Sequence, residues 1–170
     1  MMPLIMMPLI WLLLAAIPAA PAEPAVVEAV DLSRYAGKWY EIARLPNRFQ
    51  RNCTGEVTAT YELRPDGEIT VLNQCRGRDG KLKTARGTAR LADPKGSKAK
   101  LKVRFFWPFS GDYWILGLDA DYRWALVGGP KRNYLWILAR EPRLDEQTYV
   151  QIVELAHRQG FDTTRLIRSE

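Results

Sequence analysis

The chain contains few of the side chains that carry most enzyme chemistry. Its 170 residues include one histidine, His157, and two cysteines, Cys53 and Cys75. No group of histidines, cysteines or carboxylates has the spacing of metal ligands. No serine or cysteine has a sequence context that suggests a base beside it, as nucleophilic catalysis requires. We therefore expect no catalytic residue, no metal site and no cofactor, and binding is the favoured class of function.

The chain also lacks a long run of basic residues, although its formal net charge is +6. Nucleic-acid-binding arms are usually blocks of like charge, so we expect no nucleic-acid partner. Between 98 and 104 the basic residues alternate with apolar ones, and they are Lys98, Lys100, Lys102 and Arg104. This alternation fits two interpretations, a solvated strand face or a patch that makes peripheral contact with an anionic membrane surface.

Charged side chains are absent from residues 1–22, which include an apolar stretch at 10–17. Ala20-Pro21-Ala22 fits the small-residue pattern that precedes signal-peptide cleavage. The prolines and the short apolar stretch argue against a helix that spans a membrane. The sequence therefore predicts a cleaved signal peptide at 1–22 and export to the periplasm or outer membrane, with an uncleaved N-terminal anchor as the alternative. The leader has no cysteine that could carry a lipid anchor.

The remaining length suits a single domain with one core. Residues 23–30 are rich in Pro, Ala and Glu and resemble a tether, so we place the domain at 31–170. Apolar and polar residues alternate clearly at 56–64, as in a half-buried strand. No βαβ alternation is visible, so the strands should be antiparallel and connected in sequence. The expected strands are 38–45, 56–64, 68–75, 83–92, 98–106, 112–118, 122–128 and 134–140.

One helix follows the last strand. Asp145 can cap it, and Gly160 suits the position just after its end. Its apolar residues recur every three or four positions and form one stripe, made of Tyr149, Ile152, Val153 and Ala156. A stripe of this kind packs on a neighbouring surface, so we expect the helix to dock on the outside of the sheet; a partner-binding helix is the alternative.

Three motifs resemble those of the lipocalins. Gly37-Lys38-Trp39 opens the first strand, residues 119–125 lie at the turn between the sixth and seventh strands, and Arg140 ends the eighth. The surrounding sequence is most similar to the bacterial outer-membrane lipocalins, with apolipoprotein D and the plant temperature-induced lipocalins as relatives. The resemblance implies an all-β fold: an eight-stranded antiparallel up-and-down β-barrel with one C-terminal α-helix packed outside. A barrel of this size holds one small apolar ligand.

In such a barrel the first strand begins, and the eighth ends, at the same end. We expect the Arg140 guanidinium to lie on the Trp39 indole, a cation–π contact worth roughly 0.5–2 kcal/mol. Gly37, Trp39 and Arg140 should then close this end, beside a helical turn at 31–36. Their expected role is structural, because an aromatic ring there keeps water out of the base of the cavity.

The apolar side of each strand indicates which residues line the interior and contact the ligand. We expect these to be Tyr61, Val71, Asn73, Val103, Phe105, Trp114, Leu116, Trp136 and Leu138. For the sixth strand the opposite orientation stays open, because Tyr113 and Ile115 are apolar as well. Glu41 points inward as well if Trp39 does. Asn73 is polar on an otherwise apolar face, and it either orients a ligand headgroup or binds a water molecule.

The two cysteines should lie at the opposite, open end. Cys53 precedes the second strand and Cys75 ends the third, and these two strands form a hairpin around 65–67. A regular register leaves the cysteines about four residues out of step, so Gly55 or a bulge has to bend the chain. We predict a Cys53–Cys75 disulfide in an oxidising compartment, with two free thiols or an intermolecular bridge as alternatives.

Taken together, these features predict a protein that binds, and transports or stores, a small lipophilic ligand in the cell envelope. A fatty acid, a lysophospholipid or a similar amphiphile is the expected ligand, and the protein should be a monomer or a weak dimer. Two other functions stay open. A free Cys53 or Cys75 would allow a thiol-dependent lipid isomerase, and the cavity could instead carry haem or another tetrapyrrole.

Overall fold

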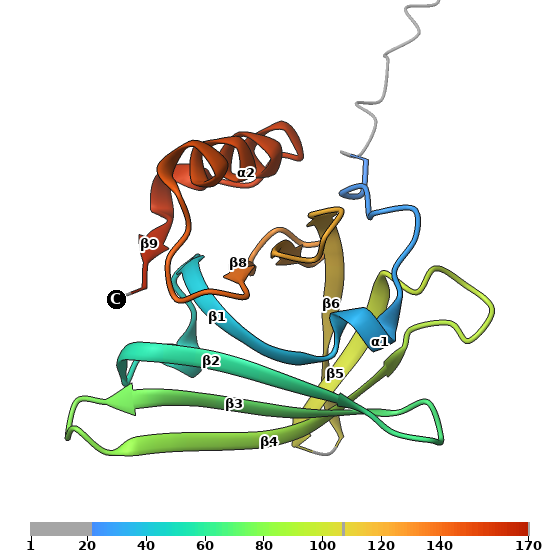
Figure 1. The fold of residues 1–170 in the computed structure, drawn as a ribbon, viewed down its shortest axis with the longest axis horizontal. Helices are drawn as coiled ribbons and strands as arrows, with labels where there is room; N and C mark the ends of the chain where they lie inside the picture. Colours follow the sequence, from blue (N-terminus) through green and yellow to red (C-terminus); the bar gives the residue numbers. More distant parts are fainter. Residues whose placement is uncertain (1–21, 107, 170) are drawn as a thin grey trace, which may run out of the picture.

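The computed structural model describes residues 22–106 and 108–169. Eight antiparallel strands form a closed barrel, in which β1 pairs with both β8 and β2 (Figure 1). The expected fold class is confirmed. The eight strands are β1 (Gly37–Arg44), β2 (Cys53–Leu63), β3 (Ile69–Gly77), β4 (Leu82–Leu91), β5 (Lys100–Phe106), β6 (Phe109–Leu118), β7 (Trp124–Gly128) and β8 (Leu135–Ala139).

A short ninth strand, β9 (Ile167–Arg168), was not expected from the sequence. It pairs with β1 at Ala43 and Arg44, beyond the point where β2 leaves β1. The last registered β1–β2 pair is Tyr40↔Thr58. The C-terminal segment therefore supplies hydrogen bonds to the part of β1 that β2 no longer reaches.

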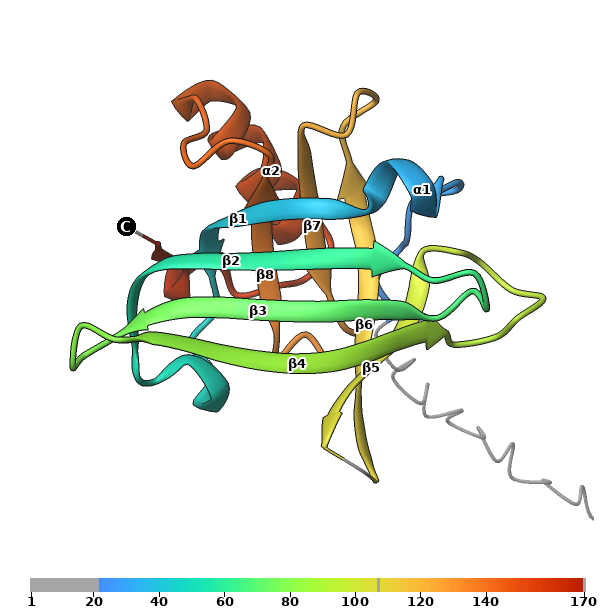
Figure 2. The same cartoon turned by 60° about the horizontal axis from the view of Figure 1, so that its bottom comes forward.

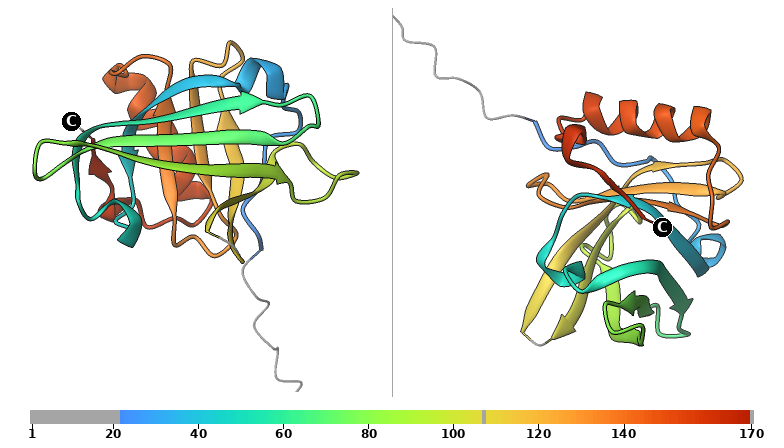
Figure 3. Two further views of the ribbon diagram at one scale, coloured as in Figure 1. Left: turned by 90° about the horizontal axis from the view of Figure 1, so that it is seen from below. Right: turned by 90° about the vertical axis from the view of Figure 1, so that its left-hand side faces the viewer.

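The strand directions divide the connections between two ends of the barrel. The β1–β2, β3–β4, β5–β6 and β7–β8 connections lie at what we call the open end. The helical turn α1 (Leu32–Tyr35) and the other connections lie at the closed end. In Figure 2 and in the left view of Figure 3, the β1–β2 and β3–β4 connections lie on the left-hand side and α1 lies on the right. Asp31 caps α1 by accepting hydrogen bonds from the Ser33 and Arg34 amides, and this capping lowers the pKa of its carboxyl group.

The helix α2 (Glu146–Arg158) packs on the outside of β6, β7 and β8, as expected. The Thr148 amide donates to the Asp145 side chain, and Gly160 has φ +85° just past the helix. Tyr149, Ile152 and Ala156 are buried in an apolar cluster shared with these strands. The barrel interior holds a second cluster, so β6 to β8 are covered on both faces.

Residues 23–30 are not a free tether. The Val27 amide donates to the carbonyl of Ile115, and Val30 is buried in the inner cluster. The valines of this segment explain the difference, because burying them on the barrel is favourable. The signal peptide expected at 1–22 lies, apart from its last residue, outside the described residues. Every helix in the described ranges is too short or too polar to span a bilayer.

Candidate functional site

The closed end is sealed by a tryptophan and an arginine. Trp39 is fully buried, and its indole donates to the carbonyl of Tyr35 at 2.8 Å. The Arg140 guanidinium carbon lies 3.9 Å from the centre of the Trp39 ring. Gly37 has φ +97°, and a Cβ there would lie 3.2 Å from the Arg140 guanidinium. The three residues expected at this end thus meet there, and a side chain at Gly37 would strain the backbone and crowd Arg140.

Just above this seal, three tyrosine hydroxyls form a chain inside the barrel. The Tyr113 hydroxyl lies 2.7 Å from that of Tyr35 and donates to that of Tyr61 at 3.0 Å. Burial raises the pKa of all three, that of Tyr61 to about 12. Together with Ile69, Ala89, Leu101 and Val103, these rings line a cavity of about 10 Å³, room for about one water molecule. We call this closed end of the barrel interior the floor. Its surface is apolar where the tyrosine rings lie and polar only at the hydroxyl chain.

The inward-facing side chains of the strands form the wall of the barrel interior. Six of the residues that the strand patterns placed inside belong to this wall, and they are Tyr61, Val71, Val103, Phe105, Trp136 and Leu138. Asn73 follows Val71 on the same face, and its buried side-chain oxygen has no hydrogen-bond partner within residues 22–106 and 108–169. Tyr61, Val71 and Leu138 are buried, whereas Asn73, Val103, Phe105 and Trp136 keep part of their surface exposed. Asn73, Phe105 and Trp136 lie nearer the open end than Tyr61 and Val71, so most of the partly exposed wall residues are on that side.

Trp114 and Leu116 are not part of this wall. Both belong to the outer cluster beneath α2, and Lys100 lies 3.8 Å from the centre of the Trp114 ring. Tyr113 and Ile115 point inward instead. The inward placement expected for Trp114 and Leu116 is wrong because α2 covers the outer face of β6, so both faces of this strand are apolar and its pattern does not distinguish them.

The β1–β2 connection folds over the open end of the wall. Its 3₁₀ turn, η1 (Arg48–Gln50), is capped by Asn47, whose side chain accepts from the Phe49 and Gln50 amides. Gln50 donates to Glu41 and accepts from the Trp136 indole. The Phe49 ring lies 5.8 Å from that of Tyr134, which stacks on Trp136. These contacts attach the β1–β2 connection to the interior wall at its open-end edge, which we call the rim.

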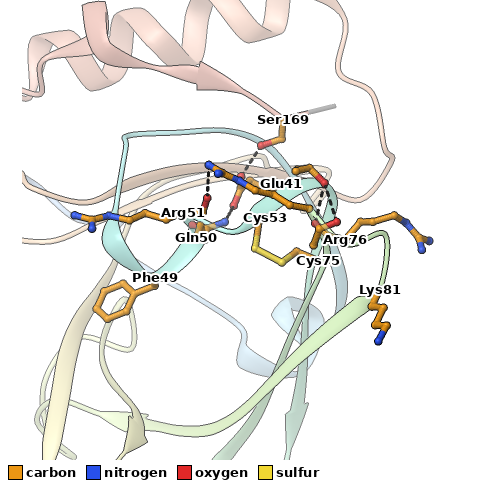
Figure 4. The surroundings of a disulfide bond; sticks show 12 residues. Glu41, Phe49, Gln50, Arg51, Cys53, Cys75, Arg76, Lys81 and Ser169 are labelled. Carbon is orange, nitrogen blue, oxygen red and sulfur yellow. Dashed lines mark hydrogen bonds between the residues drawn. A yellow bond between two sulfur atoms is a disulfide. The ribbon is translucent and has the colours of Figure 1, made fainter.

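Glu41 is the polar centre of this rim. It points inward, as the parity of Trp39 predicted, and only 4% of its side chain is exposed. The Arg44 guanidinium lies 2.9 Å from its carboxylate, and Ser169 beside β9 also donates to it (Figure 4). A buried charge requires such a partner and hydrogen bonds. The ε-nitrogen of Arg44 is buried without a partner among the described residues.

Four of these residues, Tyr35, Tyr113, Arg44 and Gln50, were missed from the sequence. The inward position of Tyr113 can be deduced only when the orientation of β6 is known, and that orientation depends on the register of β6 with β5 and β7. The Gln50 contacts join residues 9 and 86 positions apart in the sequence, so no local pattern indicates them. The spacing of three between Glu41 and Arg44 is a weak indication of an ion pair. It does not predict the pair in a regular strand, and the contact depends on a bulge in β1 between Glu41 and Ala43.

The disulfide Cys53–Cys75 is present at the open end, with a Cα–Cα distance of 5.6 Å (Figure 4). Continuing the regular pairing of Thr58 with Gln74 would leave the cysteines out of step. Two register shifts on either side of Gly55 bring Cys53 opposite Gly77, two residues from Cys75. The predicted bend at Gly55 is thus confirmed, and the bond fixes the β1–β2 connection to β3.

The barrel, its sealed floor and its apolar wall define a binding protein of the cup-shaped β-barrel class. The chain belongs to the lipocalin family, because a model of the lipocalin-like domain matches residues 30–170. It is 46% identical to Temperature-induced lipocalin-1 of Arabidopsis thaliana over 151 residues, 85% of this chain and 81% of the relative. It is 43% identical to Outer membrane lipoprotein Blc of Escherichia coli (strain K12) over 151 residues, 88% and 84% of the two chains.

Apolipoprotein D of Mus musculus is 32% identical over 157 residues, covering 86% of this chain and 80% of that protein. Among solved structures, insecticyanin from the tobacco hornworm aligns with a TM-score of 0.70 and 23% identity, over 91% of this chain and 87% of that one. This structural similarity supports the fold alone. Members of the family bind small hydrophobic ligands, which agrees with the apolar interior.

Proposed function

We propose that the protein binds a single-chain amphiphile, such as a fatty acid or a lysophospholipid. The acyl chain occupies the barrel interior and the headgroup stays at the open end. The observation that carries this proposal is the wall itself, which is apolar from the tyrosine floor to Trp136 and has most of its partly exposed residues towards the rim. Each methylene that leaves water contributes about 0.8 kcal/mol to binding.

The polar groups of the rim support this orientation. Arg44 and Gln50 lie beside the inward-facing Glu41, where a headgroup would meet hydrogen-bonding partners. Asn73 offers a buried oxygen to which no group in the described part of the chain donates. A few polar groups in an apolar site are what fixes the orientation of a ligand.

The alternatives have less support. A thiol-dependent isomerase needs a free thiol, whereas Cys53 and Cys75 are bonded to each other. A haem carrier could use His157, but this side chain is exposed on α2, outside the barrel. We therefore propose a binding protein without catalytic activity.

We also propose that the protein works in the cell envelope after removal of 1–22. The apolar leader ending in Ala20-Pro21-Ala22 supports export, as does the similarity to relatives that are named outer membrane lipoproteins. N-terminal sequencing of the protein from its native host should give Glu23 or a residue close to it. An intact Met1 in a cytoplasmic fraction would contradict export.

Titration of delipidated protein with a fluorescent fatty acid tests the ligand class, and we expect saturable binding. Phe105→Glu places a charge on the inner wall and should abolish binding while the circular dichroism spectrum stays that of a folded barrel. Val150→Glu is the matched control, because Val150 is 53% exposed on the outer side of α2. Absence of saturable binding to the wild type would refute the proposal.

A further inference from the structure

We infer that the open end docks on the surface of an anionic lipid bilayer. This inference rests on the proposed function and deepens it, because it names the surface from which the ligand enters the barrel. The first observation is apolar exposure. Of seven large apolar side chains exposed among the described residues, four belong to the open end, and they are Phe49 (66%), Leu82 (56%), Phe106 (77%) and Phe109 (77%).

All the exposed phenylalanines of the described ranges are in this group. Phe106 and Phe109 pair with each other where β5 ends and β6 begins, and these two strand ends extend below the other strands in Figure 2. Phe49 lies on η1 and Leu82 begins β4, so three of the four open-end connections each present an apolar side chain. Exposed apolar residues gathered in this way indicate an interaction surface.

Charge provides the second observation. The open-end connections with their flanks (47–54, 76–83, 105–111 and 129–134) contain eight basic residues and one acidic residue, Asp79. The basic ones are Arg48, Arg51, Arg76, Arg78, Lys81, Lys83, Lys131 and Arg132. The closed-end connections (31–36, 64–68, 92–99 and 119–123) contain five basic and six acidic residues. The excess positive charge of the chain is therefore at the open end.

Most of these cations have no internal counter-charge. Within the described part of the chain, only Arg76 of the eight forms an ion pair, with Glu56. The basic strand face at 98–104 differs, because Lys102 pairs with Asp112 and Lys100 covers Trp114 and lies near Glu23. The membrane contact that the sequence left open is thus better placed at the open end than on that face.

An anionic bilayer satisfies both features at once. Basic side chains near its surface each contribute attraction to the anionic headgroups, and aromatic side chains favour the region between headgroups and acyl chains. A second protein molecule with the same charge would be repelled. Docking in this orientation turns the opening of the barrel towards the bilayer, so an amphiphile can pass between the two with little exposure of its acyl chain to water.

Vesicle flotation with the mature protein tests the inference. We expect binding to vesicles of phosphatidylcholine with about one-third phosphatidylglycerol, little binding to pure phosphatidylcholine, and loss of binding as salt is raised, because salt screens surface charge. Phe106→Ser/Phe109→Ser should weaken binding about tenfold or more, since both side chains lose their apolar contact. Leu63→Ser/Val150→Ser, which changes exposed residues elsewhere, should leave it unchanged.

The charge contribution has its own pair of variants. Arg78→Ala/Lys81→Ala should lower vesicle binding about tenfold or more, whereas Lys95→Ala/Lys98→Ala at the closed end should not. Equal binding to neutral and anionic vesicles, or no effect of the Phe106 and Phe109 changes, would overturn the inference. So would a concentration-dependent dimer in light scattering that the same changes abolish, because the apolar residues would then belong to an interface between copies.

Fatty-acid titration without vesicles separates this inference from the proposed function. The Phe106→Ser/Phe109→Ser variant should bind fatty acid in solution like the wild type, because both side chains are 77% exposed and neither belongs to the inner cluster. Vesicle binding without fatty-acid binding would remove the proposed ligand and leave the docking surface. Fatty-acid binding without vesicle binding would support the proposed ligand and overturn the docking surface.

Discussion

The guanidinium of Arg140 lies between two parts of the closed end. One face covers the Trp39 ring, and its nitrogens donate to backbone carbonyls of α1 and β1 at 2.7–3.2 Å, those of Arg34, Tyr35, Ala36 and Lys38. Hydrogen bonds that involve a charged group contribute about 1.5–3 kcal/mol each in favourable cases, and they are not additive. A lysine has neither the planar shape nor the number of donors needed to replace them.

We therefore predict that Arg140→Lys lowers the free energy of unfolding by about 2–4 kcal/mol, since several carbonyls lose their donor. Urea unfolding followed by tryptophan fluorescence measures this change. Arg143→Lys is the control, because Arg143 is exposed and forms no ion pair among the described residues. Equal losses in the two variants would mean that Arg140 does not hold the closed end together.

Single residues were predictable where a short motif identifies them. Gly37, Trp39 and Arg140 were placed correctly because the motifs mark the ends of strands, and the topology then brings these ends together. The tyrosine chain was not predictable, since its hydroxyls join residues 78 and 52 positions apart. Tyr35 lies in a turn without periodicity. Such contacts depend on exact register, which the alternation of apolar residues does not determine.

At the level of elements, strands with one wet face were predicted best. β2 and β3 alternate, and their inward residues Tyr61 and Val71 lie in the inner cluster. The inward face of β6 was predicted wrongly, because helix α2 buries its outer face and a register shift occurs between Ile115 and Gly117. β9 has two residues, too few for a periodic pattern. The helix itself was predictable because its cap, stripe and terminal glycine all agree.

The disulfide gives a prediction at the same level. It closes a loop of 22 residues, and in the chain-entropy model a bond of this kind stabilises the fold by about 3 kcal/mol. It also fixes the β1–β2 connection, which covers the rim through Gln50 and Trp136. Cys53→Ala/Cys75→Ala should therefore lower the free energy of unfolding by about 3 kcal/mol and increase the dissociation rate of bound fatty acid.

Urea unfolding and stopped-flow displacement of a fluorescent fatty acid measure these two effects. Addition of dithiothreitol is the control, because it should destabilise the wild type and leave the double variant unchanged. An unchanged dissociation rate with the expected loss of stability would show that the bond stabilises the barrel without restraining the rim.

The whole molecule has two apolar cores that share the strands β6 to β8. The inner core continues into the proposed binding site, whereas α2 completes the outer core. A ligand site inside a barrel leaves part of the inner wall unpacked, and the outer core supplies apolar burial that does not depend on the ligand. The closed end then has to stabilise the inner core by itself, through Trp39, Arg140 and the tyrosine chain.

Because of the tyrosine chain, this stabilisation is lost at alkaline pH. Burial raises the pKa of Tyr35, Tyr61 and Tyr113 in the folded protein above the usual value of 10.0, that of Tyr61 to about 12. A raised pKa of an acidic group means that the folded state retains a proton that the unfolded state releases. Stability from these groups is therefore complete below pH 10 and is lost as the pH rises towards 12.

We predict that the free energy of unfolding falls steeply between pH 10 and pH 12, and that Tyr113→Phe makes this fall shallower. Tyr61 alone accounts for about 2 kcal/mol of the wild-type fall in this pH range. Urea unfolding at a series of pH values measures both slopes. Lysines that lose their charge in this range affect the wild type and the variant alike, so the difference between the slopes reports the tyrosines. Identical slopes would show that the buried hydroxyl chain does not control the alkaline stability of the barrel.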